Sequence, residues 1–228
     1  MVLVTGGSRG IGAAIASRFA AEGATVIAAD LDPGHPDGRI CDEQVDVASA
    51  ESVQALFDRV HADHGGVDVL VNNAGIWFRR TFAEISVEEW DRVLGVNLRG
   101  VFLCSQAALG PMIAAGGGVI LNVGSQAGLT ITRGQGAHYA ASKAAVAHLT
   151  QVMAFELGAH GIRVNCVAPA TAPPDPSMVP PDLLRQIPLG RAATPDDFTG
   201  ACVFLASPEA AYITGQTIPV NGGAVGFV

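Results

Sequence analysis

The stretch that decides the fold is the N-terminal Val2-Leu3-Val4-Thr5-Gly6-Gly7-Ser8-Arg9-Gly10-Ile11-Gly12, an apolar run followed by a glycine-rich turn. After it, Ile11, Ile15 and Phe19 recur at the spacing of one helix face. In a strand, turn and helix of this kind, glycines let the backbone and the helix N-terminus approach a pyrophosphate. The alternative is an ordinary tight turn, since such turns also collect glycine. The stretch predicts a dinucleotide site that contains Gly6, Ser8, Arg9, Gly10, Ile11 and Gly12.

An acidic residue follows the second apolar run of the chain. Asp30 ends this run, eighteen residues after Gly12. A carboxylate at this place can accept hydrogen bonds from both ribose hydroxyls of NAD, and it repels the additional phosphate of NADP. Arg9 favours NADP, yet one exposed guanidinium seldom outweighs a nearby carboxylate. We therefore expect NAD as the cofactor, the alternative for Asp30 being a plain turn residue that ends a strand.

Short apolar runs alternate with segments of helical periodicity along the whole chain. Such alternation is typical of a parallel sheet with helices on both faces. The prediction is an α/β fold with one domain over residues 1–228, a Rossmann-like, doubly wound parallel sheet of about seven strands. Residues 45–47 are a further candidate strand, and the stretch from Asp30 to Gln44 is too rich in proline and glycine for a full helix. The predicted strands cover residues 2–4, 25–29, 67–71, 119–123, 162–167 and 217–220.

Two helix starts are marked by capping residues. Ser86 and Glu89 have the spacing of a capping box, in which each side chain bonds the backbone amide of the other. Thr194 is a candidate cap, followed by Pro195 and by acidic residues at 196 and 197, which suit the positive end of a helix.

Charge and cysteine content exclude several kinds of partner. The net charge is −8 and no run of lysine or arginine compensates for it, so a nucleic acid or an anionic membrane surface is not expected to bind. The four cysteines are scattered without a CxxC pair, which predicts no metal site and favours a reducing compartment. Met1 leads directly into the first strand, without a basic or long apolar leader, and we expect a cytoplasmic protein.

A possible catalytic group lies in the second half of the chain. Tyr139 and Lys143 are four residues apart on a predicted helix, so they share a face with Val146 and Thr150. A neighbouring ammonium favours the phenolate form of a tyrosine. Ser125 follows the strand over residues 119–123, where its hydroxyl could hold a substrate oxygen. The alternative is an incidental Tyr/Lys pair on a solvated helix.

Asn97 is a polar residue on the buried stripe of the predicted helix that begins near Ser86. It is in register with Trp90, Leu94 and Val101, and a buried amide must find hydrogen-bond partners. It is either a satisfied core residue or a link in a proton relay.

Taken in order, these motifs resemble the short-chain dehydrogenase/reductase family across nearly the whole chain. The motifs are TGGSRGIG, Asp46 in QVDV, NNAG, Asn97, Ser125, Tyr139-x-x-x-Lys143, RVNCVAP, PLGR and YITGQ. The resemblance implies that Tyr139 is the general acid/base, that Ser125 polarises the substrate oxygen and that Lys143 binds the nicotinamide ribose. It also implies that Asn97 holds a relay water. By the same resemblance, the residues beside the cofactor include Asp46, Val47, Asn73, Ala74, Gly75, Pro169 and Ala170.

The sequence departs from the family pattern in its last third. Members usually have PG after the sixth strand and a threonine a few residues later, whereas this chain has Pro169-Ala170-Thr171-Ala172-Pro173-Pro174. The substrate lid, expected at about residues 170–190, is shorter than usual, so the pocket is either open or completed by a neighbouring subunit. The spacing from Ser125 to Tyr139 is one residue longer than common. His138 is an additional acid/base candidate, although a histidine at a helix start is more often incidental.

The resulting function is an oxidoreductase that moves a hydride between NAD(H) and a small secondary alcohol or ketone. The alternative is a catalytically weak NAD-binding sensor or scaffold of the same fold, suggested by Ala170 and the short lid. Alanines at 140, 141, 144, 145 and 147 predict a helix surface for a homodimer or homotetramer, unless they only pack on the sheet. The candidate substrate contacts are Trp77, Ser125, Gln126 and Tyr139, with Ile76, Phe78, Met178 and Val179 as further apolar candidates.

Overall fold

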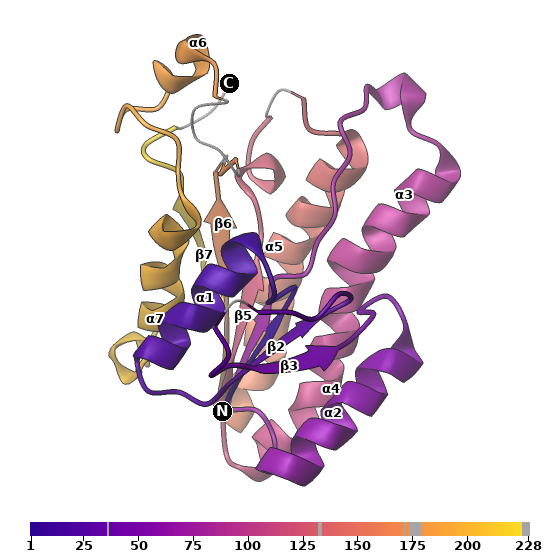
Figure 1. Ribbon diagram of the computed structural model, residues 1–228, viewed down its shortest axis with the longest axis vertical. Helices are drawn as coiled ribbons and strands as arrows, with labels where there is room; N and C mark the ends of the chain where they lie inside the picture. Colours follow the sequence, from indigo (N-terminus) through magenta and orange to yellow (C-terminus); the bar gives the residue numbers. More distant parts are fainter. Residues whose placement is uncertain (36, 132–133, 171, 174–178, 225–228) are drawn as a thin grey trace.

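The computed structural model describes residues 1–35, 37–131, 134–170, 172–173 and 179–224 (Figure 1). Its centre is one seven-stranded parallel sheet in the order β3-β2-β1-β4-β5-β6-β7, which confirms the predicted fold class. The order reverses between β1 and β4, and this is the point at which ligands bind in doubly wound sheets. The strands are β1 (Val2–Thr5), β2 (Val26–Asp30), β3 (Cys41–Gln44), β4 (Val69–Asn72), β5 (Gly118–Val123), β6 (Ile162–Pro169) and β7 (Thr217–Val220).

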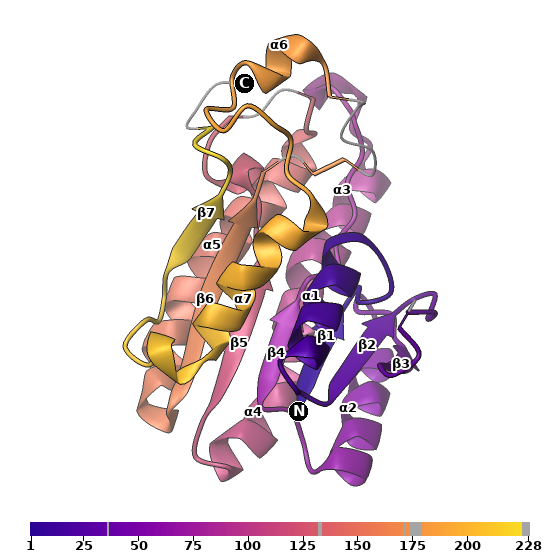
Figure 2. The ribbon, with the colours of Figure 1, turned by 60° about the vertical axis from the view of Figure 1, so that its left-hand side comes forward.

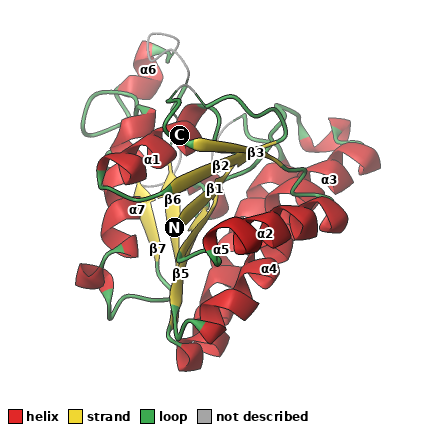
Figure 3. Ribbon diagram, turned by 60° about the horizontal axis from the view of Figure 1, so that its bottom comes forward, coloured by secondary structure: helices red, strands yellow, loops and turns green. Residues whose placement is uncertain are grey.

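Helices cover both faces of the sheet, as Figures 2 and 3 show. Helices α1 (Gly10–Ala21) and α7 (Thr199–Ala206) pack on one face, where Ile15, Phe19 and Leu205 contact β-strand valines. The other face carries α2 (Ala50–His64), α4 (Gly100–Ala114) and α5 (Ala137–Leu157). Because successive strand residues point to opposite faces, the central strands must be apolar at nearly every position. β1, β2 and β5 meet this requirement, since almost all their side chains are buried.

The predicted strand at residues 45–47 is wrong, because the strand lies just before it. β3 has the polar sequence CDEQ and pairs only with β2, at the edge of the sheet. An edge strand needs little apolar surface, so its sequence gave no strand signal. Val45 and Val47 are buried in the loop that follows, and they belong to the core rather than to the sheet.

The segment between β2 and β3 contains no helix among its described residues, as predicted from its prolines and glycines. A buried histidine fixes this segment on α1. His35 Nε2 lies 3.2 Å from the carbonyl oxygen of Ala13, and the His35 backbone amide donates to the Asp42 carboxylate at 3.0 Å. The connection between β2 and β3 is thus a short loop rather than a helix, and the His35 side chain holds it on α1.

The stretch Val87–Ala114 combines α3 (Val87–Leu94), a π-helical segment (Gly95–Arg99) and α4. By length and composition alone it could cross a membrane. Core helices of folded proteins meet the same criteria, and α4 buries Val101, Cys104, Ala108 and Met112. Packing against the sheet and α2 therefore accounts for its apolar character.

The cysteines give a direct check of this packing. Cys41 is exposed on β3, whereas Cys104, Cys166 and Cys202 are buried. Burial raises the pKa of both Cys104 and Cys202 to about 12, and it also raises the pKa of Cys166. Since the thiolate is the reactive form, we expect one fast-reacting thiol in the folded protein and four in denaturant, measured with a chromogenic disulfide reagent. Two or more fast thiols in the folded protein would contradict the packing of α4, β6 and α7.

Candidate active site

A cleft of about 1160 Å³ lies at the carboxyl ends of the central strands. At one end it is lined by the glycine turn and Asp30, and at the other by Ser125, Tyr139 and Lys143. These residues come from four separate parts of the chain, the turn after β1, the end of β2, the turn after β5 and helix α5, which the parallel sheet brings to one edge. Most residues of the predicted site therefore line one cavity. The exceptions are Ser8 and Asn97, which do not line it.

Two glycines shape the turn at the cofactor end. Gly10 has a φ of 57° and no atom within 4 Å of the place where a Cβ would be, so it leaves an open cradle at the start of α1. At Gly12 a Cβ would lie 2.0 Å from the carbonyl oxygen of Gly6 and 2.5 Å from Asn73 Nδ2. No side chain fits there, and the helix is held tightly against the loop after β4.

The polar groups around this cradle fit a dinucleotide. No side chain caps the first amides of α1, and its first turn has no acidic residue. Ser8 Oγ is buried without a hydrogen-bond partner. Free amides, an unpaired hydroxyl and a positive helix end are what a pyrophosphate requires. The donor set of the turn therefore agrees with the predicted role of Gly6, Ser8, Arg9, Gly10, Ile11 and Gly12.

Asp30 lies at the end of β2 with its side chain only 6% exposed. Its carboxylate accepts long hydrogen bonds of 3.3 Å from the backbone amides of Ser8 and Asp32. The Arg9 guanidinium lies 3.6 Å away and is itself 72% exposed. The carboxylate is thus fixed beside the cradle, where ribose hydroxyls could donate to it, while Arg9 offsets part of its charge.

The side wall of the cofactor end comes from two loops. Val47 is buried against Gly100, and the neighbouring Asp46 is exposed at the cleft with its carboxylate bonded to the Ala48 amide at 2.9 Å. Asn73 Nδ2 donates to the carbonyl oxygens of Thr5 and Gly6 at 3.0 Å each. The amide of Asn73 thus ties the loop after β4 to the glycine turn, with Ala74 and Gly75 following at the cleft.

Tyr139 lies in the first turn of α5, and Ser125 follows β5. Burial raises the pKa of Tyr139 above its usual value, while a side-chain hydrogen bond with Ser125 lowers it. Ser125 is buried and its Oγ also accepts from the Ala127 amide at 3.1 Å. The Ser125 hydroxyl is therefore fixed by the local backbone, and both residues line the cleft.

Lys143 is one helical turn further on, and it is almost completely buried. Its ammonium donates to the Val123 carbonyl oxygen at 2.7 Å and lies 5.9 Å from the centre of the Tyr139 ring. Desolvation lowers the pKa of Lys143 to about 8. Its Nζ would lie 3.5 Å from a Cβ on Gly75, so the glycine gives the ammonium access to the cofactor side of the cleft.

Asn97 is fully buried in the π-helical segment between α3 and α4, a distortion that is frequent at functional sites. Its Oδ1 accepts from the Ile76 amide at 2.8 Å, and its Nδ2 donates to the Ile76 carbonyl and to Ser142 Oγ. The carboxamide therefore joins the Gly75 loop to α5. The relay water implied by the family resemblance stays a prediction.

Ser142 was not among the predicted site residues, yet it completes this network. Its hydroxyl donates to the Tyr139 carbonyl oxygen at 2.7 Å and accepts from Asn97. The signal was present but easily missed, since Ser142 is a small polar residue on the buried side of a helix, next to Lys143.

The predicted capping box at the start of α3 is only half formed. Ser86 Oγ accepts from the Glu89 amide at 3.1 Å, but the Glu89 carboxylate does not return to Ser86. It lies instead 3.0 Å from His138 Nε2 and 3.3 Å from Arg80 Nε. The Glu89 carboxylate, which would otherwise complete the capping box, instead contacts the buried imidazole of His138. At Thr194 the box with Asp197 is complete, although the first turn is a 3-10 helix (Pro195–Phe198).

The substrate end of the cleft is bounded by Trp77, Gln126, Pro169 and Ala170. Trp77 is 57% exposed, and Gln126 is buried with its Nε2 bonded to the Ala224 carbonyl at 2.5 Å. The expected lid at about residues 170–190 contributes Ala172, Pro173 and Leu183 to the wall. Thr171, Pro174 and Met178 lie outside the described residues.

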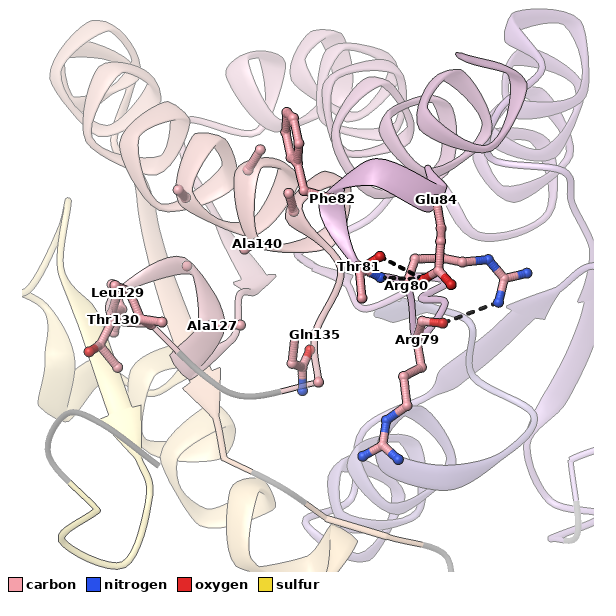
Figure 4. Close-up of a pocket in the computed structure, with 16 residues that line it drawn as sticks. Arg79, Arg80, Thr81, Phe82, Glu84, Ala127, Leu129, Thr130, Gln135 and Ala140 are labelled. Carbon is pink, nitrogen blue, oxygen red and sulfur yellow. Dashed lines mark hydrogen bonds between the residues drawn. The ribbon is translucent and has the colours of Figure 1, made fainter. Parts of the chain in front are cut away.

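A second cavity of about 790 Å³ lies on another side of α5. Figure 4 shows Phe82, Leu129 and Ala140 around it, with Thr81 bonded to Glu84 at its rim. Ala140, Ala141 and Ala144 form its helical wall, while Tyr139 and Lys143 line the first cleft. In the described part of the chain, no group of three or more His, Cys, Asp or Glu side chains is placed to hold a metal ion.

Comparison with known proteins agrees with this geometry. A family model described as enoyl-(acyl carrier protein) reductase, one of the short-chain dehydrogenase/reductase models, matches residues 6–225. A crystal structure of a short-chain dehydrogenase from Leptospira borgpetersenii with bound NAD+ superposes with a TM-score of 0.92 at 32% identity, covering 98% of this chain and 91% of that one. The chain belongs to the short-chain dehydrogenase/reductase family of oxidoreductases.

Curated relatives within the family carry different names. A D-threitol dehydrogenase of Mycolicibacterium smegmatis is 41% identical over 98% of this chain and 92% of its own length. A 3-oxoacyl acyl-carrier-protein reductase of Vibrio cholerae is also 41% identical, over 98% and 96%. Equal identity to an alcohol dehydrogenase and to a ketoreductase defines the reaction class but leaves the substrate open.

Proposed function

We propose that this protein is an NAD-dependent oxidoreductase that interconverts a small secondary alcohol and its ketone. The observation that carries the proposal is the arrangement of the cleft, with Asp30 and the glycine turn at one end and Ser125, Tyr139 and Lys143 at the other. A dinucleotide is long enough to connect two such ends. The solved relative with bound NAD+ supports the choice of cofactor.

The side chains of the catalytic end have distinct tasks in this proposal. When bound, the nicotinamide ring supplies the hydride acceptor or donor. Ser125 holds the substrate oxygen, and Tyr139 removes its proton in oxidation or returns it in reduction. Lys143 hydrogen-bonds the ribose and places a positive charge beside the phenol, which opposes the effect of burial on the Tyr139 pKa. Trp77 and Gln126 bound the substrate.

The proposal is tested with a panel of secondary alcohols, polyols and ketones, 3-oxoacyl thioesters included. We expect a change in the absorbance of reduced nicotinamide with at least one member. The second candidate function, a sensor or scaffold, is motivated by Ala170, which stands where the family usually has glycine. It predicts NAD binding by titration calorimetry without turnover of any member, and that result would contradict the proposed enzyme.

The wild-type protein is expected to prefer NAD over NADP by about 10- to 100-fold in kcat/KM. The reason is that the buried Asp30 carboxylate repels a 2′-phosphate by about 1–3 kcal/mol. Asp30→Asn removes the charge but keeps one of the two acceptor oxygens, which bond the Ser8 and Asp32 amides, so it should reduce this preference at a modest cost in stability. Steady-state kinetics with both cofactors measures the ratio. Equal use of NADP by the wild type would refute the role given to Asp30.

We further propose a homodimer or homotetramer. Among the alanines of α5, Ala147 is buried against the core, contrary to its predicted place on the surface, but Ala141 and Ala144 are exposed. Phe155, on the same helix, is 90% exposed, which is unusual for a side chain of this size. Light scattering at micromolar concentration should give at least twice the monomer mass. Phe155→Lys should weaken the assembly, and a wild-type monomer would contradict the proposal.

A further inference from the structure

One of the buried titratable side chains without a task in the proposed reaction lies next to Tyr139. His138 precedes Tyr139 in the first turn of α5 and is fully buried. Its ring packs at 6.2 Å from the Phe78 ring, and a Cβ on Gly136 would lie 2.2 Å from its Cε1. It does not line the cleft, so it cannot replace Tyr139 as the acid/base. A histidine held this closely is not incidental.

Both ring nitrogens of His138 are occupied, and their partners determine the tautomer. The Tyr139 backbone amide lies 2.9 Å from Nδ1 and can only donate, so Nδ1 must carry the lone pair. Nε2 therefore carries the proton and donates to Glu89 Oε1 at 3.0 Å. Protonation would place a second N–H at Nδ1, directly against the amide of Tyr139.

Charged groups around the ring come from three elements. Glu89 reaches it from α3 and is paired with Arg80 of the loop before α3. Arg92, also of α3, lies 5.8 Å from the centre of the Phe78 ring, on which His138 packs. From α5 itself the titratable neighbour is Tyr139. His138 thus connects a charged network on α3 to the backbone of the residue assigned to proton transfer.

The peptide groups on both sides of Tyr139 are fixed. Its amide donates both to His138 Nδ1 and to the Gly136 carbonyl oxygen, and its carbonyl oxygen accepts from Ser142, which is bound in turn by Asn97. We propose that His138, held by Glu89 with a proton on Nε2, is a positioning residue for Tyr139. This inference rests on the proposed function, because it assigns to Tyr139 the proton transfer described above.

The test uses variants that separate packing from hydrogen bonding. His138→Leu removes both hydrogen bonds, whereas His138→Asn keeps an acceptor at the place of Nδ1. Glu89→Gln weakens the network from α3, where the side chain is partly exposed, so this variant is expected to fold even if His138→Leu does not. His148→Asn on α5 and Glu88→Gln on α3 are matched controls, because both residues are exposed.

In the assay with NAD, His138→Leu should lower kcat by about 10- to 100-fold, the usual effect of removing a group that orients a functional side chain. Its KM for NAD should not change. His138→Asn, which keeps an acceptor for the Tyr139 amide, should restore most of the activity. Glu89→Gln should show an intermediate loss. Unchanged kcat in His138→Leu and Glu89→Gln, or a kcat in His138→Asn no higher than in His138→Leu, would overturn the proposal.

A second readout needs no turnover and so separates this inference from the proposed function. The chain has two tyrosines, and Tyr212 is fully exposed, so Tyr212→Phe leaves Tyr139 as the sole phenol. In this background, with NAD bound, ultraviolet titration reports Tyr139 alone. His138→Leu should move the Tyr139 pKa upward, because the contribution of Ser125 is lost, and His148→Asn should not. If the wild type turned over nothing, the proposed function would fail, and an unshifted phenol titration would remove the positioning role as well.

Discussion

Tyr139→Phe is expected to lower kcat by about 10²–10⁴-fold, which is the range for proton transfer by a positioned group. The substitution keeps the ring and removes only the hydroxyl that interacts with Ser125. The affinity for NAD, measured by calorimetry, should change little. Circular dichroism should match that of the wild type, since the ring is retained among its neighbours.

Tyr212→Phe is the matched control, because it removes the same hydroxyl from a fully exposed side chain. It should leave kcat unchanged. Near wild-type kcat in a folded Tyr139→Phe protein would contradict the assignment of the acid/base. The next candidates would then lie among the other groups of the cleft. His138 would not be among them, since both of its ring nitrogens bond away from the cleft.

Lys143→Ala is expected to impair both catalysis and cofactor binding, with a loss of about 10²–10³-fold in kcat/KM. A buried charge-assisted hydrogen bond contributes about 1.5–3 kcal/mol, and the lost cation also makes Tyr139 a weaker acid. The pH profile for alcohol oxidation should therefore move to higher pH, while the affinity for NAD falls. Tyr139→Phe is expected to impair catalysis but not NAD binding, so calorimetry with NAD distinguishes the two variants.

Lys143→Arg provides the comparison that isolates geometry from charge. The buried site holds a compact ammonium 2.7 Å from the Val123 carbonyl, and a planar guanidinium has no equivalent place there. We expect Lys143→Arg to recover little activity. If Lys143→Ala bound NAD as tightly as the wild type, the ribose contact assigned to Lys143 would be wrong.

Alkaline pH should also act on Lys143 in the protein without cofactor. Burial lowers the pKa of Lys143 to about 8, below its value in the unfolded chain. The charged form is thus disfavoured by folding, and this cost is present below pH 8 and declines as pH rises toward the unfolded value. NAD binding that needs the ammonium should therefore weaken above about pH 8, while the buried thiols remain protonated.

The fold could be predicted because the central strands are buried on both faces. Continuous apolar runs such as those of β1 and β5 give a clear signal, and the predicted strand limits differ from the observed ones by only one or two residues. β3 could not be found in this way. Its polar residues lie at the edge of the sheet, and its pairing depends on β2, which lies more than ten residues earlier in the chain.

The candidate site was predictable where one residue type at one spacing has a defined chemistry. Tyr139 and Lys143 are four residues apart on a helix, and Asp30 follows a strand, so the chain itself places them. The network behind them was not predictable. Glu89 and His138 are 49 residues apart, and only the packing of α3 against α5 brings them together. Local sequence predicted a capping box for Glu89 because the competing imidazole is distant in the chain.

The measurement that tests the central claim most directly is the fate of a deuterium label. A secondary alcohol accepted in the panel, deuterated at its carbinol carbon, is incubated with the wild-type protein and NAD, and the reduced cofactor is examined by mass spectrometry. If the cleft transfers a hydride directly between substrate and nicotinamide, the deuterium is found on the reduced cofactor, and Tyr139→Phe slows its appearance. A reduced cofactor without deuterium, or bound NAD that is never reduced by any alcohol, would contradict the account.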